Sequence, residues 1–211
     1  MENQTEKRIL ISDFDGTLGV GEIERDFINY LMKGKKLSIY NYFLAVVSIP
    51  VNRVLGVFSK GNLLKAWKAK LSKDRLTILI HDYIDNYCNI KINRTVYNFI
   101  ETFNGYKVLL TGSSVELVCS FLHANNMDSL FDEVIGCTTK KNGFLINKHP
   151  YGKDKVAFLE NMKGYKIGLE NEYADRYFLC KCDEVFIVNP DDELERFAKE
   201  HGWNTIDFLE D

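Results

Sequence analysis

The sequence predicts an α/β protein with a doubly wound parallel sheet and an inserted helical domain. Short apolar runs alternate with helix-like stretches, which is the pattern of a parallel sheet with helices on both faces. The predicted strands are residues 8–12, 107–110, 165–169 and 184–188. Helical spacing occurs at residues 115–124, 155–162 and 192–201.

One interval is too long for this pattern. From Gly16 to Leu110 the chain runs for 95 residues, whereas a β-α-β unit needs only about 30. We expect the excess to form a helical cap domain at residues 20–92, inserted into a core of residues 1–19 and 93–211. Candidate helices of the cap are residues 22–33, 38–48, 62–71 and 76–87.

The composition is that of a folded domain without a strong overall charge. The 211 residues are 45% hydrophobic and 27% charged, and the formal net charge is −3. This balance argues against a general nucleic-acid binder. The five cysteines include no C-x-x-C pair, and the polar start of the chain is unlike a secretory signal. We therefore expect reduced thiols in a cytoplasmic protein.

Basic residues concentrate within the predicted cap. Residues 33–75 contain ten Lys or Arg and one acidic residue, a net charge of +9, which leaves −12 for the rest of the chain. Nearby, residues 62–71 place Trp67 and three leucines on one helical face and lysines on the other sides. Basic amphipathic segments of this kind suit anionic membrane surfaces.

An uncharged run at residues 37–52 lies between these basic residues. As a helix it would span about 24 Å, short of a hydrocarbon core of about 30 Å. Pro50 also interrupts it, so we do not expect a transmembrane span. Two interpretations stay open: a buried helix of the cap, which length alone favours, and a helix that lies in a membrane interface.

Two aspartates directly follow the first predicted strand. In an extended chain, residues two apart point the same way, so Asp13 and Asp15 can face one pocket. Gly16 permits a tight turn and leaves backbone N–H groups free for an anion. Adjacent carboxylates repel each other unless a divalent cation neutralises one of them or one is protonated. Taken alone, the segment also fits an ordinary turn.

Further polar groups follow the later strands. Residues 111–114, Thr-Gly-Ser-Ser, are expected to turn into a helix whose N-terminus and free amides suit a phosphate. Lys153 and Lys155 open the next helix, and residues 170–175 form an acidic turn. Because ligands of parallel sheets bind at the carboxyl ends of the strands, we expect these groups at one site.

This order of motifs resembles the haloacid dehalogenase (HAD) superfamily of phosphohydrolases over nearly the whole chain. The first motif is complete at residues 13–17, the second matches Thr111-Gly112, and the third is a lysine, for which Lys155 fits better than Lys153. The insertion between the first two motifs looks like the cap of the phosphoserine-phosphatase-like branch. The resemblance implies a Rossmann-like core with a helical cap.

The resemblance also implies a two-step phosphoryl transfer with Mg²⁺ as cofactor. Asp13 would attack phosphorus and become an aspartyl phosphate, while Asp15 would protonate the leaving alkoxide and then activate water. Mg²⁺ would be held by Asp13, the Asp15 backbone carbonyl and the acidic turn. The residues expected to bind phosphate are Gly16, Thr17, Thr111, Gly112, Ser113 and Lys155.

The acidic turn departs from the pattern of the family, in which three or four residues separate two aspartates. Counting back from Asp175 places either Asn171 or Glu170 at the first position. We favour Asn171 as the metal ligand beside Asp175, because the apolar pair that follows then keeps the spacing of the family. Glu170 stays open as the alternative. A neutral asparagine oxygen should hold Mg²⁺ more weakly than a carboxylate does.

The cap is expected to select the substrate, a small-molecule or lipid phosphomonoester. Its apolar stretch and the basic amphipathic stretch after it look similar to the cap of phosphatidylglycerophosphatase C-type enzymes, whose substrate is a lipid phosphate. We therefore expect a lipid-like phosphomonoester and peripheral contact with an anionic membrane. Two alternatives stay open: a soluble phosphatase of small metabolites, and a phosphate-binding protein that lost turnover through Asn171.

Overall fold

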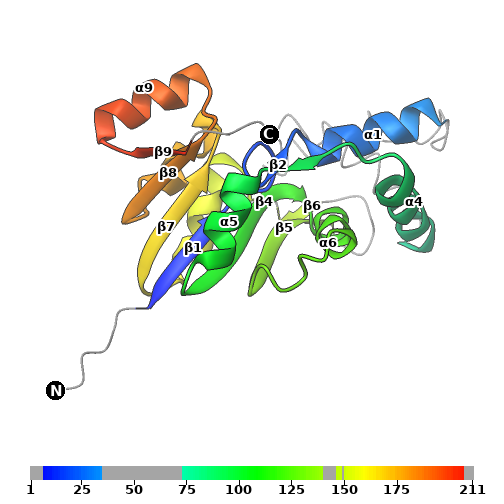
Figure 1. The fold of residues 1–211 in the computed structure, drawn as a ribbon, viewed down its shortest axis with the longest axis horizontal. Helices are drawn as coiled ribbons and strands as arrows, with labels where there is room; N and C mark the ends of the chain where they lie inside the picture. Colours follow the sequence, from blue (N-terminus) through cyan, green and yellow to red (C-terminus); the bar gives the residue numbers. More distant parts are fainter. Residues whose placement is uncertain (1–6, 35–72, 140–145, 149, 207–211) are drawn as a thin grey trace.

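A seven-stranded sheet forms the centre of the molecule (Figure 1). The structure is a computed structural model that describes residues 7–34, 73–139, 146–148 and 150–206. The strand order is β6-β5-β4-β1-β7-β8-β9, and every strand is parallel to its neighbours except β6, which runs antiparallel to β5. The strands are β1 (Arg8–Ser12), β4 (Tyr106–Ser114), β5 (Glu133–Thr139), β6 (Ile146–Lys148), β7 (Tyr165–Glu170), β8 (Glu184–Val188) and β9 (Asn204–Ile206).

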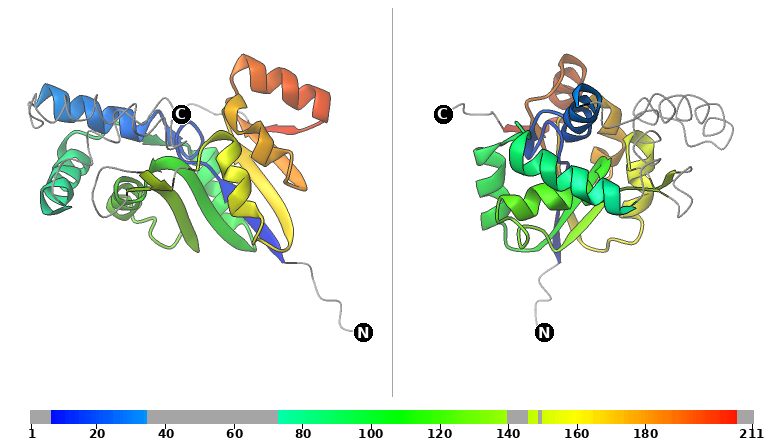
Figure 2. Two further views of the ribbon diagram at one scale, coloured as in Figure 1. Left: turned by 180° about the vertical axis from the view of Figure 1, so that it is seen from behind. Right: turned by 90° about the vertical axis from the view of Figure 1, so that its right-hand side faces the viewer.

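Helices cover both faces of the sheet, which confirms the doubly wound architecture (Figure 2). They are α5 (Arg94–Thr102), α6 (Val115–Ala124), the 3₁₀ helix η1 (Gly152–Lys155), α7 (Val156–Leu159), the 3₁₀ helix η2 (Tyr173–Asp175), α8 (Arg176–Leu179) and α9 (Asp192–His201). Alternate residues of β1 face opposite ways. Leu10 joins a hydrophobic cluster with α5 and α6, whereas Ile9 and Ile11 join a second cluster with α7, α8 and α9.

Most predicted elements lie where the sequence places them. The four predicted strands correspond to β1, β4, β7 and β8, and the helices predicted at 115–124 and 192–201 are α6 and α9 with the same bounds.

Two expectations were wrong at an element's end. The strand predicted at 107–110 continues to Ser114 instead of turning, because it still pairs with β5 after a shift in register beyond Leu110. The helix predicted at 155–162 begins as η1 at Gly152 and ends with α7 at Leu159, where the Met162 amide closes a turn on the Leu159 carbonyl oxygen.

Three strands and one helix carry no clear signal in the sequence. β5 starts with Glu133 and contains Gly136, so it lacks an apolar run, and β6 and β9 have three residues each. The helix α5 begins after Asn93, whose side chain accepts a hydrogen bond from the Val96 amide as an N-cap.

The two ends of the predicted cap lie side by side in the structure. The short strand β2 (Gly19–Val20) pairs antiparallel with β3 (Lys91–Ile92). Between them, α1 (Ile23–Lys33) and α4 (Lys73–Asn86) match two of the predicted cap helices closely. The helices predicted at 38–48 and 62–71, and the uncharged run at 37–52, lie outside the described residues. The boundaries of the cap at residues 20–92 stay a prediction.

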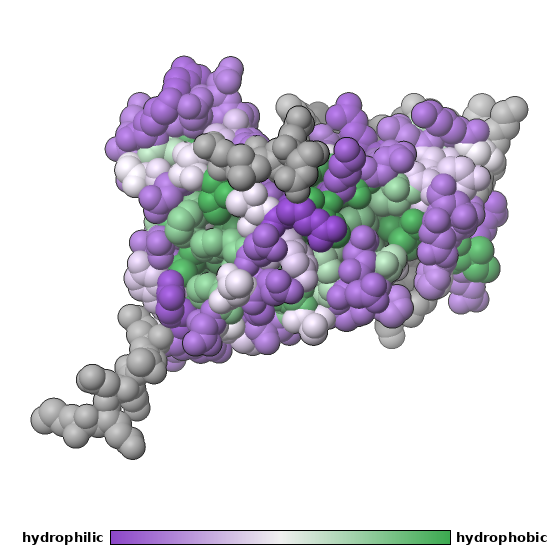
Figure 3. Space-filling view, viewed as in Figure 1, coloured by the Kyte–Doolittle hydropathy of each residue, from purple (hydrophilic) through white to green (hydrophobic). Residues whose placement is uncertain are grey.

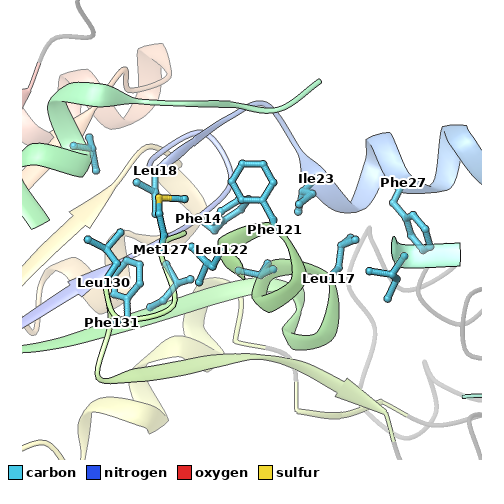
Figure 4. Packing of buried hydrophobic residues seen from close by; sticks show 14 of the residues in the cluster. Phe14, Leu18, Ile23, Phe27, Leu117, Phe121, Leu122, Met127, Leu130 and Phe131 are labelled. Atoms are coloured by element: carbon cyan, nitrogen blue, oxygen red, sulfur yellow. The ribbon is translucent and has the colours of Figure 1, made fainter. Parts of the chain in front are cut away.

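The helix α1 packs on the core through α6 (Figure 4). Ile23 and Phe27 of α1 and Leu117 of α6 are buried in the same hydrophobic cluster as the sheet. Phe27 also meets Tyr83 of α4 edge to face, with ring centroids 5.2 Å apart. The first helix after β2 is therefore held against the helix that follows β4.

The surface of the described residues is mixed. On the face shown in Figure 3, polar side chains predominate at the edges and hydrophobic ones gather nearer the middle. The helix α4 exposes Ile78, at 68% relative accessibility. Within the described ranges, no helix combines the length and the apolar character that crossing a membrane requires.

Candidate active site

The predicted functional residues gather at the carboxyl ends of three neighbouring strands, β4, β1 and β7. Register pairs Ser12 of β1 with Leu109 of β4 and with Leu169 of β7. Asp13 continues this alignment, because its amide donates to the Leu169 carbonyl oxygen at 3.1 Å. Residues that follow these strands therefore meet at one edge of the sheet, where ligands of parallel sheets bind.

A tight turn follows β1 and depends on Gly16. The Gly16 amide donates to the Gly19 carbonyl oxygen at 2.8 Å, and the Gly19 amide donates to the Phe14 carbonyl oxygen at 2.8 Å. Gly16 has φ of +72°, and a Cβ atom on it would lie 2.1 Å from Nδ2 of Asn171. Both the left-handed backbone and the close approach of Asn171 thus require glycine here.

Lys155 lies at the centre of a buried ionic cluster. Its Nζ is 3.1 Å from Oδ2 of Asp13, 2.6 Å from Oε2 of Glu170 and 2.9 Å from Oδ2 of Asp175. All four side chains are at least nine-tenths buried. Burial alone would lower the pKa of Lys155, but the three carboxylates outweigh it and raise that pKa well above its usual value. This lysine therefore stays charged.

The other candidate lysine has a different environment. Lys153 places its ammonium over the ring of Tyr177, 4.7 Å from the centroid. Of the two candidates, the structure brings Lys155 to the carboxylates.

The carboxylates of this cluster carry more negative charge than Lys155 balances. With all groups ionised, Asp13, Glu170, Asp175 and Lys155 sum to −2. Burial raises the pKa of Asp13 and that of Glu170, against the opposing effect of Lys155. Oδ2 of Asp175 is buried, and its contact among the described residues is the ion pair with Lys155, which lacks hydrogen-bond geometry. A divalent cation would neutralise the cluster and coordinate that oxygen.

The donor set fits Mg²⁺. Among the described residues, Asp13, Glu170 and Asp175 each offer an oxygen, and these atoms all lie within 4.8 Å of one another. One amide position of Asn171 lies 2.9 Å from the Asp15 carbonyl oxygen and 3.2 Å from Oε1 of Glu170. Oxygen ligands about 2.9 Å apart are what an octahedron with bonds of about 2.0–2.1 Å requires.

The amide of Asn171 can serve this site in two orientations. With its nitrogen in that position, it donates hydrogen bonds to Asp15 and Glu170. With its oxygen there, it faces the Asp15 carbonyl oxygen and Oε1 of Glu170 and accepts a hydrogen bond from the Thr17 hydroxyl at 3.3 Å; a bound cation would stabilise this arrangement. The structure thus brings both Asn171 and Glu170, the two alternatives for the first acidic position, to the same site.

Asp15 is held at both carboxylate oxygens. Oδ1 accepts a hydrogen bond from the Ile23 amide at 2.7 Å, and Oδ2 accepts one from the Ser113 hydroxyl at 2.5 Å. Burial and then the negative charge of Asp13 raise the pKa of Asp15 from 3.8 to about 7. A carboxyl group with this pKa can both give and take a proton near neutral pH.

The predicted phosphate-binding residues lie around this edge of the sheet and differ in burial and in hydrogen bonding. Thr17 and Thr111 are fully buried, and Oγ1 of Thr111 accepts a hydrogen bond from the Ser113 amide at 3.1 Å. The hydroxyl of Ser113 donates its hydrogen bond to the Asp15 carboxyl group. A Cβ atom on Gly112 would lie 3.6 Å from Cδ2 of Tyr151, so that ring stands beside the second motif.

Sequence reasoning missed two residues next to the site, Tyr151 and Glu24. Tyr151 is hydrogen-bonded to Glu172, and burial raises the pKa of Tyr151 to about 12. Glu24 of α1 is buried and bound to Ser114. No local motif marks either of them, since each reaches the site through a contact with a distant segment. An acidic residue within an otherwise apolar helix face is the only sequence signal that Glu24 offers.

Several solved structures have a fold similar to that of this chain. A protein of unknown function from Bordetella pertussis Tohama I aligns with 97% of this chain and 100% of its own, at 13% identity and a TM-score of 0.76. A HAD family hydrolase from Salmonella enterica serovar Typhi aligns with 95% of this chain and 68% of its own, at 11% identity and a TM-score of 0.58. A phospho-aspartyl intermediate analogue of phosphoserine phosphatase aligns with 98% and 96%, at 13% identity and a TM-score of 0.58.

These likenesses show that the chain has the fold of HAD-family hydrolases, as its motifs led us to expect. No family model matches the chain, and no curated protein matches it in sequence.

Proposed function

We propose that this protein is a Mg²⁺-dependent phosphomonoester hydrolase that works through an aspartyl phosphate on Asp13. The observation that carries the proposal is the buried cluster in which three carboxylates, those of Asp13, Glu170 and Asp175, surround the single ammonium group of Lys155. Asp15, with a pKa of about 7, stands two residues beyond the nucleophile. The fold supports the proposal, because it is shared by phosphoserine phosphatase, of which a phospho-aspartyl intermediate analogue has been solved.

The first step transfers the phosphoryl group to the protein. An oxygen of the Asp13 carboxylate attacks phosphorus, the bond between phosphorus and the ester oxygen breaks, and Asp15 gives its proton to the departing alkoxide. Lys155 favours the ionised form of Asp13 against the effect of burial, and it attracts the phosphoryl oxygens. The products of this step are the free alcohol, aspartyl phosphate and ionised Asp15.

The second step returns the enzyme to its starting state. Ionised Asp15 takes a proton from water, whose oxygen attacks the phosphorus of the aspartyl phosphate. The bond between phosphorus and the Asp13 oxygen breaks, which releases inorganic phosphate. Bound Mg²⁺ supplies charge neutralisation at the phosphoryl oxygens. Asp13, the Asp15 carbonyl, Asp175 and either Asn171 or Glu170 are the groups that would hold it.

The test is phosphate release from a panel of phosphomonoesters, with and without Mg²⁺. The panel contains p-nitrophenyl phosphate, phosphoserine, sugar phosphates and phosphatidylglycerophosphate in mixed micelles. We expect metal-dependent turnover that Asp13→Asn lowers by at least about a thousand-fold. The matched control is Asp128→Asn, since Asp128 is exposed and contacts His123 on the surface. Turnover that persists in Asp13→Asn would contradict the nucleophile.

For the substrate, we propose a lipid or lipid-like phosphomonoester reached by peripheral contact with an anionic membrane. The sequence supports this proposal through the net charge of +9 in residues 33–75 and the uncharged run at 37–52. We expect co-sedimentation with vesicles that contain phosphatidylglycerol but not with neutral phosphatidylcholine vesicles. Failure to bind anionic vesicles, together with turnover of phosphoserine or sugar phosphates, would favour the soluble phosphatase. Folded protein without any turnover would favour the phosphate-binding role.

A further inference from the structure

Two consecutive residues at the start of α1, Ile23 and Glu24, form hydrogen bonds with Asp15 and with Ser114, respectively. Glu24 is 8% exposed. Its Oε2 accepts one hydrogen bond from the Ser114 amide at 3.1 Å and another from the Ser114 hydroxyl at 2.5 Å. The residue before it, Ile23, donates its amide to Oδ1 of Asp15 at 2.7 Å. The start of the predicted cap is thus tied both to Asp15 and to the end of β4.

The end of β4 repeats this arrangement from the other side. Ser114 binds Glu24, and the residue before it, Ser113, donates its hydroxyl to Oδ2 of Asp15 at 2.5 Å. Each oxygen of Asp15 therefore has a donor that is directly adjacent in sequence to one partner of the Glu24–Ser114 contact. Neighbouring Cα atoms are held about 3.8 Å apart, so each donor moves with the residue next to it. If the Glu24–Ser114 contact is lost, Ile23 and Ser113 can therefore shift relative to Asp15.

We propose that Glu24 is a positioning residue for proton transfer: by binding Ser114, it keeps the donors from Ile23 and Ser113 aligned on Asp15. The inference rests on the proposed phosphatase function and extends it to a residue of the predicted cap. Burial of a carboxylate is costly unless hydrogen bonds compensate it, and two donors to one oxygen supply that compensation here. These hydrogen bonds join α1 to the end of β4, next to the residues that contact Asp15.

A purely structural role is the competing explanation. Ser114 is the N-cap residue of α6, and a carboxylate near a helix N-terminus stabilises the helix. The hydroxyl of Ser114, however, forms no capping bond with α6 and is directed to Glu24 instead. A structural role predicts loss of stability with equal effects on all substrates. A positioning role predicts a larger loss where the reaction depends on protonation of the leaving group.

The two roles separate when leaving groups are compared. Nitrophenolate leaves readily without a proton, whereas an alkoxide needs one from Asp15, and general acid catalysis contributes about 10²–10⁴-fold. The experiment measures kcat/KM, which covers steps up to phosphoryl transfer, for p-nitrophenyl phosphate and for glycerol 3-phosphate. For Glu24→Ala we expect a fall of about 10–100-fold with glycerol 3-phosphate and less than about 3-fold with p-nitrophenyl phosphate.

Conservative and matched variants complete the test. Glu24→Gln keeps an acceptor oxygen for Ser114, so it should recover most of the loss with glycerol 3-phosphate. Glu116→Ala is the control, because Glu116 is an exposed acid in the first turn of the same helix, α6. Ser114→Ala removes only the hydroxyl and should reproduce the selective loss of Glu24→Ala if that variant folds poorly.

The outcomes distinguish this inference from the proposed function. Asp13-dependent hydrolysis of p-nitrophenyl phosphate by the wild type establishes the function independently of Glu24. With that activity present, an equal fall on both esters, or no fall on either, would overturn the positioning role. Absence of Asp13-dependent turnover in the folded wild type would overturn the proposed function and this inference with it.

Discussion

The raised pKa of Asp15 predicts that this carboxyl group destabilises the folded protein at neutral and alkaline pH. The perturbation is Asp15→Asn, which removes the ionisable group. The asparagine oxygen can still accept from the Ile23 amide, and its nitrogen can donate to the Ser113 hydroxyl, so both contacts persist with little change in shape. The variant therefore isolates the cost of ionisation, provided that the protein is kept free of metal.

The sign and the size follow from the shift of the Asp15 pKa from 3.8 to about 7. Below about pH 3 the carboxyl is protonated in both folded and unfolded states, so it costs nothing. As pH rises from about 4 to 7, the unfolded chain loses the proton first, and stability is lost until the folded state also ionises. The whole window corresponds to about 4 kcal/mol at most, of which about 2.6 kcal/mol falls between pH 5 and 8.

The assay is urea denaturation in EDTA at half-unit steps from pH 4.5 to 8.5. We expect the gain in free energy of unfolding of Asp15→Asn over wild type to increase up to about pH 7 and then stay constant. Glu160→Gln is the control for the removal of a carboxylate, because Glu160 is exposed on the surface. A gain that is independent of pH, or that decreases as pH rises, would refute the reasoning.

Three further predictions concern the ionic cluster and the turn after β1. Lys155→Met leaves three buried carboxylates without their cation, so it should cost about 3–5 kcal/mol of unfolding free energy in EDTA; stability equal to wild type would contradict the ionic role of this lysine. Gly16→Ala should cost at least about 1–2 kcal/mol by urea denaturation, because of its φ of +72°, and should weaken Mg²⁺ binding by displacing Asn171; unchanged stability and affinity would show that the turn adapts. Asn171→Asp adds a carboxylate to the site and should tighten Mg²⁺ binding about ten-fold by titration calorimetry; unchanged or weaker binding would indicate that Glu170, not position 171, holds the metal.

Local sequence patterns were sufficient for the parts of the fold that depend on neighbouring residues. The apolar runs of β1, β7 and β8 and the periodic faces of α6 and α9 each lie within one short segment, so their positions could be predicted. The strands β5, β6 and β9 are short or polar and form mainly because a neighbouring strand offers hydrogen bonds. The extension of β4 to Ser114 has the same cause, since pairing with β5 overrides the turn tendency of its small residues.

The sequence by itself determined the chemistry that is available at the site. It places Asp13 and Asp15 two residues apart after an apolar strand, and a lysine and an acidic turn after later strands, which suffices to predict a phosphate and metal site. Only the tertiary structure decided which groups share that site. It selects Lys155 over Lys153, adds Glu170 to the carboxylates, and brings Glu24 to Ser114 across 90 residues of chain. The reason is physical: burial and Coulomb interactions depend on distances through space. These distances are known only when segments far apart in the sequence have packed together.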